Sequence, residues 1–196
     1  MVKIITHSAV FGTTFDTALG SFSGSISSGD KILDLGIRLL SNEAGAIGYN
    51  FYGVTDKINN PPTGTSTIIG AAGATVADLI GSFNGSIGAG DRITSLDVGV
   101  GTGSAGAVTE YVIIASKEGG NKSFGDTEVF ADNDTTLALA VGSVASDYTN
   151  DDGITHIASD AAFNYATGSP TDFFVVCTKR RKSDPYYKEY VVNPKF

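Results

Sequence analysis

The sequence has no tryptophan, one methionine and one cysteine, Cys177. A single cysteine excludes an intramolecular disulfide and a zinc site built from cysteines. No apolar run approaches the ~18 residues of a membrane-spanning helix, so we expect no membrane segment. Residues 1–7 lack the apolar stretch and the small-residue cleavage site of a secretory signal. We therefore expect synthesis in the cytoplasm without a signal peptide.

Cations are also scarce. The 196 residues hold 13 Lys and Arg against 21 Asp and Glu, which gives a net charge of −8. This balance argues against a protein that binds nucleic acid without sequence preference, because such binding needs a basic face. Residues 179–196 carry six cations and two acids, whereas residues 1–178 carry seven cations and nineteen acids. An acidic body is thus followed by a short cationic segment.

An internal repeat is the strongest pattern that the sequence does contain. Residues 20–32 (GSFSGSISSGDKI) and 81–93 (GSFNGSIGAGDRI) match at nine of thirteen positions with a spacing of 61. A further shift of 61 gives a degenerate third copy at 142–154, where a Gly-Ser-Val and an Asp-Gly-Ile stand in the same frame. Three frames with the same internal distances indicate tandem units.

The ends of the units agree with this division. The runs FYGVTDK (51–57), YVIIASK (111–117) and FFVVCTK (173–179) are aromatic and β-branched, and each closes on a lysine. At 41% hydrophobic and 17% charged residues, the chain has the composition of one ordered domain. We predict a domain over 1–178 with three repeats, at about 1–61, 62–122 and 123–178, and a C-terminal arm over 179–196.

Each repeat is predicted to consist of strands. After each Gly-Asp pair the apolar residues mix spacings of two and three, which is typical of a strand with a bulge. The closing runs are continuous Val, Ile, Phe and Tyr, which is typical of strands buried on both faces. Residues 75–81 and 135–141 could form short helices, but the corresponding segment 15–19 is short, and we predict strands in these places.

Three equivalent β units have three apolar faces to bury. The simplest closure places them around a pseudo-threefold axis, as in a β-prism or a β-trefoil. A β-sandwich or jelly roll, to which the units contribute unequal strands, is the alternative. The sequence therefore predicts an all-β fold with an extended C-terminal arm.

A local motif bears on this choice. Residues 23–40 (SGSISSGDKILDLGIRLL), with Phe22 before them, contain a Phe-x-Gly, a further glycine and a hydrophobic-Gly-hydrophobic strand; the matching positions are Phe22, Gly24, Gly29, Leu35, Gly36 and Ile37. This stretch resembles the closing strand pair of jacalin-like β-prism lectins, and residues 91–100 resemble a sister strand. The resemblance implies a β-prism that binds glycans. The family's Gly-x-x-x-Asp sugar loop is not matched, because Leu33 and Thr94 stand at the aspartate position.

Residues able to do enzymatic chemistry are few. His7 and His156 are expected to be hydrogen-bonded strand residues, because no nucleophile motif accompanies them. Cys177 lies in an apolar run and is expected to be a buried, inert thiol. Residues 101–106 satisfy Gly-x-Gly-x-x-Gly, but a predicted strand follows in place of the phosphate-binding helix. We expect neither enzyme activity nor a cofactor.

Acidic loops offer the one signal for a metal. Asp147, Asp151 and Asp152 are weak calcium candidates, but their segment does not fit the register of an EF-hand. Asp30, Asp91 and Asp152 recur once per repeat. They could be three equivalent binding points, but we favour a structural role in which each carboxylate accepts backbone N–H groups in a turn.

The C-terminal arm is the most informative segment. It combines cations, tyrosines and a short β-branched run: Lys179, Arg180, Arg181, Lys182, Tyr186, Tyr187, Tyr190, Val191 and Val192. The acidic body would repel nucleic acid, so we expect neither nucleic acid nor a membrane as partner. An arm that adds a strand to an acidic neighbouring copy would gain main-chain hydrogen bonds and charge complementarity. A frayed terminus is the alternative.

Together these features predict a non-enzymatic structural protein. We expect a virion component of a tailed phage, either a head-decoration or a tail protein. It would assemble with copies of itself and with other shell proteins through its surface and its arm. The alternative is a lectin-like β module that binds surface glycans, with the repeats as multivalent sites.

Overall fold

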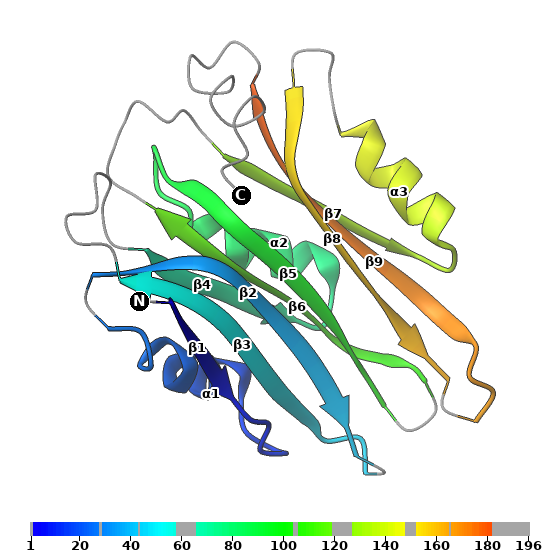
Figure 1. The fold of residues 1–196 in the computed structure, drawn as a ribbon. Helices are drawn as coiled ribbons and strands as arrows, with labels where there is room; N and C mark the ends of the chain where they lie inside the picture. The colour runs from blue at the N-terminus through cyan, green and yellow to red at the C-terminus, as the bar shows by residue number, and fades with distance from the viewer. Residues whose placement is uncertain are drawn as a thin grey trace.

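The computed structural model describes residues 2–27, 29–42, 44–57, 66–103, 106–118, 127–147, 152–164 and 166–181. These residues form nine strands and three helices (Figure 1). In chain order they are β1 (Val2–His7), α1 (Phe15–Ser23), β2 (Asp30–Ser41), β3 (Ile47–Lys57), β4 (Thr67–Gly73), α2 (Val76–Gly85), β5 (Arg92–Thr102), β6 (Val108–Glu118), β7 (Glu128–Asp134), α3 (Leu137–Ser146), β8 (Asp152–Phe163) and β9 (Pro170–Arg181).

The order strand–helix–strand–strand occurs three times, and we number these groups unit 1, unit 2 and unit 3. Each unit forms its own antiparallel sheet, in which the last strand lies in the middle: β1-β3-β2 is sheet 1, β4-β6-β5 is sheet 2 and β7-β9-β8 is sheet 3. The molecule is thus mostly β, as predicted. The helices of the three units begin 61 residues apart, which is the spacing of the sequence motifs.

The segments predicted as additional strands are helices, and this part of the prediction was wrong. Thr14, Thr75 and Thr136 are the N-caps, and each threonine side chain accepts a hydrogen bond from the backbone N–H three residues later. Such a cap satisfies one of the free donors of the first turn. Apolar residues spaced by three and four, such as Leu79 and Phe83, then face the sheet.

The predicted bulge occurs in the second strand of every unit. The register shifts between Ile32 and Asp34, between Ile93 and Ser95, and between Ile154 and His156. The residues directly after the bulge pair with Val54, Ser116 and Thr178 on the third strands. Corresponding residues of the third strands are therefore 62 positions apart in the sequence, whereas corresponding residues of the second strands are 61 positions apart.

The three sheets lie one after another in chain order, with sheet 1 in blue and cyan, sheet 2 in green and sheet 3 in yellow and orange (Figure 1). β5 packs against β2 on one side and β8 on the other, α1 packs against β4, and α2 against β7. A pseudo-threefold closure would also bring unit 1 against unit 3. The main packing contacts of the described residues instead join consecutive units.

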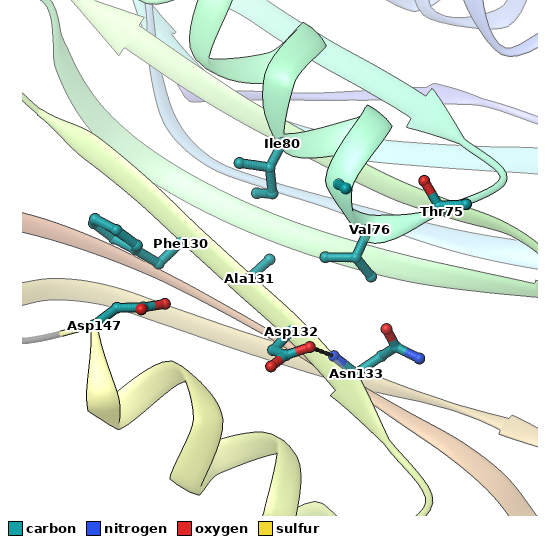
Figure 2. Close-up of a pocket in the computed structure, with 9 residues that line it drawn as sticks. Thr75, Val76, Ile80, Phe130, Ala131, Asp132, Asn133 and Asp147 are labelled. Atoms are coloured by element: carbon teal, nitrogen blue, oxygen red, sulfur yellow. Dashed lines mark hydrogen bonds between the residues drawn. The ribbon is translucent and has the colours of Figure 1, made fainter.

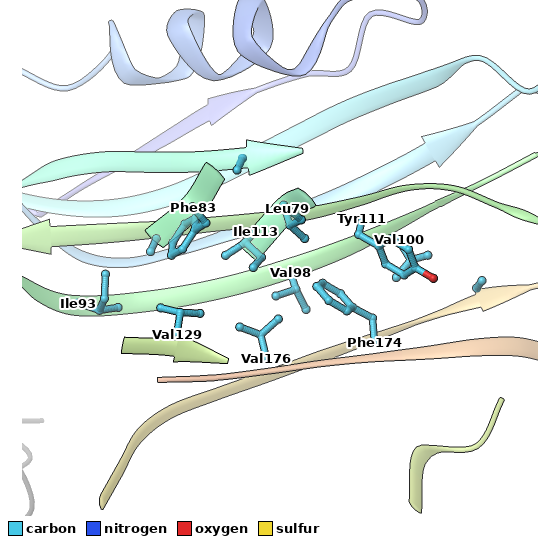
Figure 3. Close-up of a cluster of buried hydrophobic side chains, with 13 residues drawn as sticks. Leu79, Phe83, Ile93, Val98, Val100, Tyr111, Ile113, Val129, Phe174 and Val176 are labelled. Carbon is cyan, nitrogen blue, oxygen red and sulfur yellow. The ribbon is translucent and has the colours of Figure 1, made fainter. Parts of the chain in front are cut away.

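The core lies between these layers and not around a central axis. The largest buried cluster is formed by α2, sheet 2 and the facing side of sheet 3, and includes Phe83, Ile113 and Phe174, all 0% exposed (Figure 3). A second cluster fills the space between sheet 1, α1 and sheet 2 around Phe22 and Phe51. A small third cluster lies under α3. Each layer thus buries one face against the next.

Candidate functional site

The junction between units 1 and 2 is a helix lying directly on a strand. A Cβ added at Gly70 in β4 would lie 2.8 Å from Phe15 Cζ and 3.0 Å from Leu19 Cδ2 of α1. Gly70 pairs with Ile114 in β6, which is 0% exposed on the same face. We call the face of a helix that meets the next unit, and the face of a sheet opposite to its own helix, the outer face. The outer face of α1 is therefore covered by the outer face of sheet 2.

The junction between units 2 and 3 repeats this arrangement with other side chains. Val76 and Ile80 of α2 hold the places of Phe15 and Leu19, and they pack with Ala131 of β7 (Figure 2). Between α2 and α3 the surface forms a groove of about 510 Å³. Its lining consists of Thr75, Val76, Ala77, Ile80, Phe130, Ala131, Asp132, Asn133 and Asp147. The groove is the space left beside this junction.

A tyrosine hydroxyl crosses each junction. Tyr49 donates to Glu110 Oε2 over 2.5 Å, and Tyr111 donates to Asp172 Oδ2 over 2.6 Å. Burial raises the pKa of both tyrosines, and the hydrogen-bonded carboxylates raise it further. Both hydroxyls therefore stay protonated and donate at neutral pH. Burial also raises the pKa of Glu110, while the hydrogen bond from Tyr49 lowers it.

Aspartate side chains of units 2 and 3 also accept hydrogen bonds from the edge strand of the preceding sheet. The backbone N–H of Ile37 in β2 donates to Asp97 Oδ2 over 2.8 Å, and that of Val100 in β5 donates to Asp160 Oδ2 over 2.9 Å. Burial raises the pKa of Asp97, its backbone hydrogen bonds lower it, and the charges of Asp160 and Asp34 raise it. A capped edge strand cannot pair with a foreign strand at these positions.

Charged side chains form a further contact between units 1 and 2. Glu118 is 1% exposed and lies 3.3 Å from Lys31 Nζ of unit 1 and 2.9 Å from Arg92 of unit 2. Lys117 Nζ lies 2.6 Å from Asp91 Oδ2. These carboxylates are held by cations inside the stack, which is the arrangement of a structural ion network.

The two ends of the stack are the candidate functional site, because they expose positions that the interior buries. Ile4, Ile68 and Val129 occupy one position, because they pair with the corresponding third-strand residues Val54, Ser116 and Thr178. Their exposed fractions are 73%, 9% and 1%. Tyr52 in sheet 1 is 50% exposed, whereas its counterpart Ile114 is fully buried. We name the outer face of sheet 1, with Val2, Ile4 and Tyr52, the head face.

The opposite end is formed by α3 and β8. Leu137 holds the place of Phe15, directly after the N-cap, and is 46% exposed where Phe15 is 4% exposed. Val141 and Ile157 are exposed as well. The counterpart of Ile157 in unit 1, Leu35, is buried. We name Leu137, Val141 and Ile157 the tail face.

The aspartates that recur in each unit lie in turns. Asp30 Oδ2 accepts the N–H of Ser27 over 3.1 Å, and Asp91 Oδ2 accepts the N–H of Gly88 over 2.8 Å. These hydrogen bonds are of the kind expected from a structural role. Asp152 begins β8, and its backbone is described without its side chain. The three residues belong to separate units: Asp30 begins β2, Asp91 directly precedes β5 and Asp152 begins β8.

The first residues of the predicted arm belong to sheet 3. β9 continues to Arg181 because Lys179, Arg180 and Arg181 pair with Ile154, Gly153 and Asp152 of β8. Lys179 Nζ lies 3.1 Å from the carbonyl oxygen of Asp147 and 4.1 Å from the centre of the Phe130 ring. The remaining predicted arm residues, Lys182, Tyr186, Tyr187, Tyr190, Val191 and Val192, lie outside the described residues.

The weak calcium candidates do not form a cluster that the structure describes. Asp147 is the C-cap of α3, Asp151 lies outside the described residues, and the Asp152 side chain is not described. Within the described ranges, no group of three or more His, Cys, Asp and Glu residues is placed to hold a metal ion.

The histidines and the cysteine take structural positions. Cys177 is 2% exposed and packs in the cluster under α3. His7 lies beside the Phe51 ring, with 6.1 Å between ring centres. His156 Nδ1 lies 3.2 Å from Thr178 Oγ1. Burial lowers the pKa of His156, as does the charge of Arg92, whereas a hydrogen bond to the Thr94 backbone raises it.

This lowered pKa predicts a loss of stability in mild acid. Below pH ~6.5, the pKa of histidine in the unfolded chain, the unfolded chain binds a proton at His156, whereas the folded protein does so only below the lower pKa of folded His156. The free energy of unfolding therefore falls as the pH is lowered from ~6.5 to the pKa of folded His156. Each unit of lowering is worth about 1.4 kcal/mol. In urea titrations between neutral pH and pH ~5, His156→Gln should flatten this dependence, whereas His7→Gln should keep it. An unchanged slope in His156→Gln would refute the assignment.

Comparisons of the chain with known protein families, with curated proteins and with solved structures find no match. The three helices span nine or ten residues. Across the described part of the chain, no helix has the length and apolar character needed to cross a bilayer.

Proposed function

We propose that this protein is a non-enzymatic structural subunit that assembles with copies of itself and with other proteins of a particle. The observation that carries the proposal is the pair of apolar end faces. In repeat proteins the terminal units usually present a polar outer face, which keeps the array soluble and single. Here the ends expose the aliphatic and aromatic side chains Ile4, Tyr52, Leu137 and Val141. Surfaces of this kind mark protein–protein contacts.

The particle that we propose is the virion of a tailed phage, with the protein in the head decoration or the tail. The support is the composition, rich in Gly and poor in charge, together with the stacked β units and the basic segment at the C-terminal end. The carboxylates described above serve the junctions between units as ion pairs and edge caps. Their engagement there fits a structural role better than a catalytic one.

The solution mass of the full chain tests this proposal. Light scattering over a wide concentration range should show a mass that rises above that of the 20.2 kDa monomer. An antibody against the chain should label purified virions in electron micrographs. A chain that stays monomeric throughout and labels no particle would refute the proposal. A monomer that binds specific sugars on a glycan array would favour the lectin-like alternative.

A further inference from the structure

The two end faces have complementary construction. Inside the stack, the outer face of a helix always lies on the outer face of the following sheet: α1 on β4, and α2 on β7. Among the residues that the structure describes, no further sheet follows α3, whose outer face is the tail face, and no helix precedes sheet 1, whose outer face is the head face. The surfaces that remain exposed are therefore the two halves of a junction that the chain already forms twice.

From this we infer that the tail face of one chain packs on the head face of a second copy, so that the chains join head to tail. The inference rests on the proposed function and names its contact. Leu137 and Val141 would lie over Ile4 and Thr6, as Phe15 and Leu19 lie over the corresponding part of β4. Such a contact is heterologous, because each chain contributes a different surface.

The donor and the acceptor of the tyrosine–carboxylate link are both replaced at the end faces. Phe173 in unit 3 holds the place of Tyr49 and Tyr111, so the tail has no hydroxyl to donate at that point. Gly48 in unit 1 holds the place of the acceptors Glu110 and Asp172. At the position of this link, a contact between the two ends would therefore bury neither an unpaired tyrosine hydroxyl nor an unpaired carboxylate, both of which are costly.

A loop of unit 1 occupies the part of the head face that the acceptors would need. A Cβ added at Gly48 would lie 2.9 Å from Ala9 Cβ and 3.2 Å from Phe11 Cδ1. The N–H of Ala9 donates to Asn50 Oδ1 over 2.8 Å, which holds the loop against β3. The strand positions Ile4, Thr6 and Tyr52 remain exposed beside this loop. The docking surface is thus the part of the face that corresponds to Ile68, Gly70 and Ile114.

Position 139 provides a matched control on the same helix. Leu139 of α3 is 55% exposed, and its counterparts Thr17 and Asp78 are polar and exposed although their helices are covered. The side of the helix that carries Leu139 therefore lies outside the junction. A charge at Leu139 should leave the contact intact, whereas a charge at Val141 should break it, because it would be buried without a partner.

The test compares the full-length chain with Ile4→Glu, Val141→Glu and Leu139→Glu by sedimentation velocity and light scattering. The unaltered chain and Leu139→Glu should form species larger than dimers as the concentration rises. Ile4→Glu and Val141→Glu should each be monomeric, since one blocked face leaves every chain without a complementary partner. An equimolar mixture of these two should double the mass to a dimer and stop there, because only one tail and one head remain intact.

The mixture distinguishes this contact from other forms of assembly. If the chain instead formed a symmetric dimer through its head faces, Ile4→Glu would be monomeric. Mixing it with Val141→Glu would then not give a dimer that contains one chain of each variant. If the unaltered chain assembles and both single variants still assemble, the head-to-tail contact is refuted while the proposed function stands. If the unaltered chain is monomeric at every concentration, both fail. Far-UV circular dichroism and thermal melts should be unchanged in all variants, because the altered side chains are exposed.

Discussion

Replacing Phe83 by alanine is expected to lower the free energy of unfolding by about 3 to 5 kcal/mol. Phe83 lies in α2, is 0% exposed and belongs to the buried cluster that α2 shares with sheets 2 and 3 (Figure 3). Truncation removes the ring from contact with both layers and leaves a cavity that packed strands cannot close. The truncation should therefore weaken the packing of both unit 2 and unit 3, and not that of α2 alone.

Urea denaturation, followed by circular dichroism, measures this loss as a lower midpoint with an unchanged slope. Ser82→Ala is the matched control, because Ser82 is the exposed neighbour of Phe83 on the same helix. It should change stability by less than about 0.5 kcal/mol. A loss below about 1 kcal/mol for Phe83→Ala would mean that α2 does not hold sheets 2 and 3 together as described.

Gly70→Ala is expected to destabilise the protein by about 1 to 3 kcal/mol, even though alanine usually suits a strand better than glycine. The added Cβ would lie 2.8 Å from Phe15 Cζ and 3.1 Å from the backbone oxygen of Ile113, so α1 would be pushed away from sheet 2. At the second junction the counterparts are Val76 and Ala131. The smaller helix residue there leaves room for a Cβ on the strand.

This exchange of sizes gives a double-mutant cycle. Phe15→Val should itself be destabilising, but the pair Phe15→Val and Gly70→Ala copies the second junction and should cost less than the two changes added together, by about 0.5 to 3 kcal/mol. Gly81→Ala is the control: Gly81 is exposed in α2 with no atom within 4 Å of an added Cβ. It should stabilise the helix by roughly 0.5 to 1 kcal/mol. Strict additivity would contradict the packing of α1 on β4.

The repeat frame and the bulged strands could be predicted from the sequence, because glycine, aspartate and apolar residues recur in them at fixed distances. The helices were missed since their apolar residues are few and the first of them, α1, spans nine residues. Thr14, Thr75 and Thr136, spaced by 61, were the signal that could have found them. A hydroxyl residue recurring before each short apolar segment is the mark of an N-cap.

The junctions were harder to foresee. Tyr49 and Glu110 are separated by 61 residues, the repeat spacing, but so is any pair of corresponding positions. The closing runs align by eye on their lysines at 57 and 117, a spacing of 60, whereas the pairing opposite the bulges gives 62. Only the strand register shows that Tyr111 corresponds to Tyr49. The open ends likewise depend on which units touch, and periodicity does not contain that information.

Unit 2 is distinguished by carrying both halves of the tyrosine–carboxylate link in neighbouring residues, with Glu110 accepting from the unit before it and Tyr111 donating to the unit after it. Unit 1 has only the donor, and unit 3 has only the acceptor. If the segment that encodes unit 2 were duplicated in frame, each copy would contain both the acceptor Glu110 and the donor Tyr111. The Tyr111 of the first copy would then lie at the junction with the Glu110 of the second copy. For this link, an added copy of unit 2 would therefore offer an acceptor to the unit before it and a donor to the unit after it.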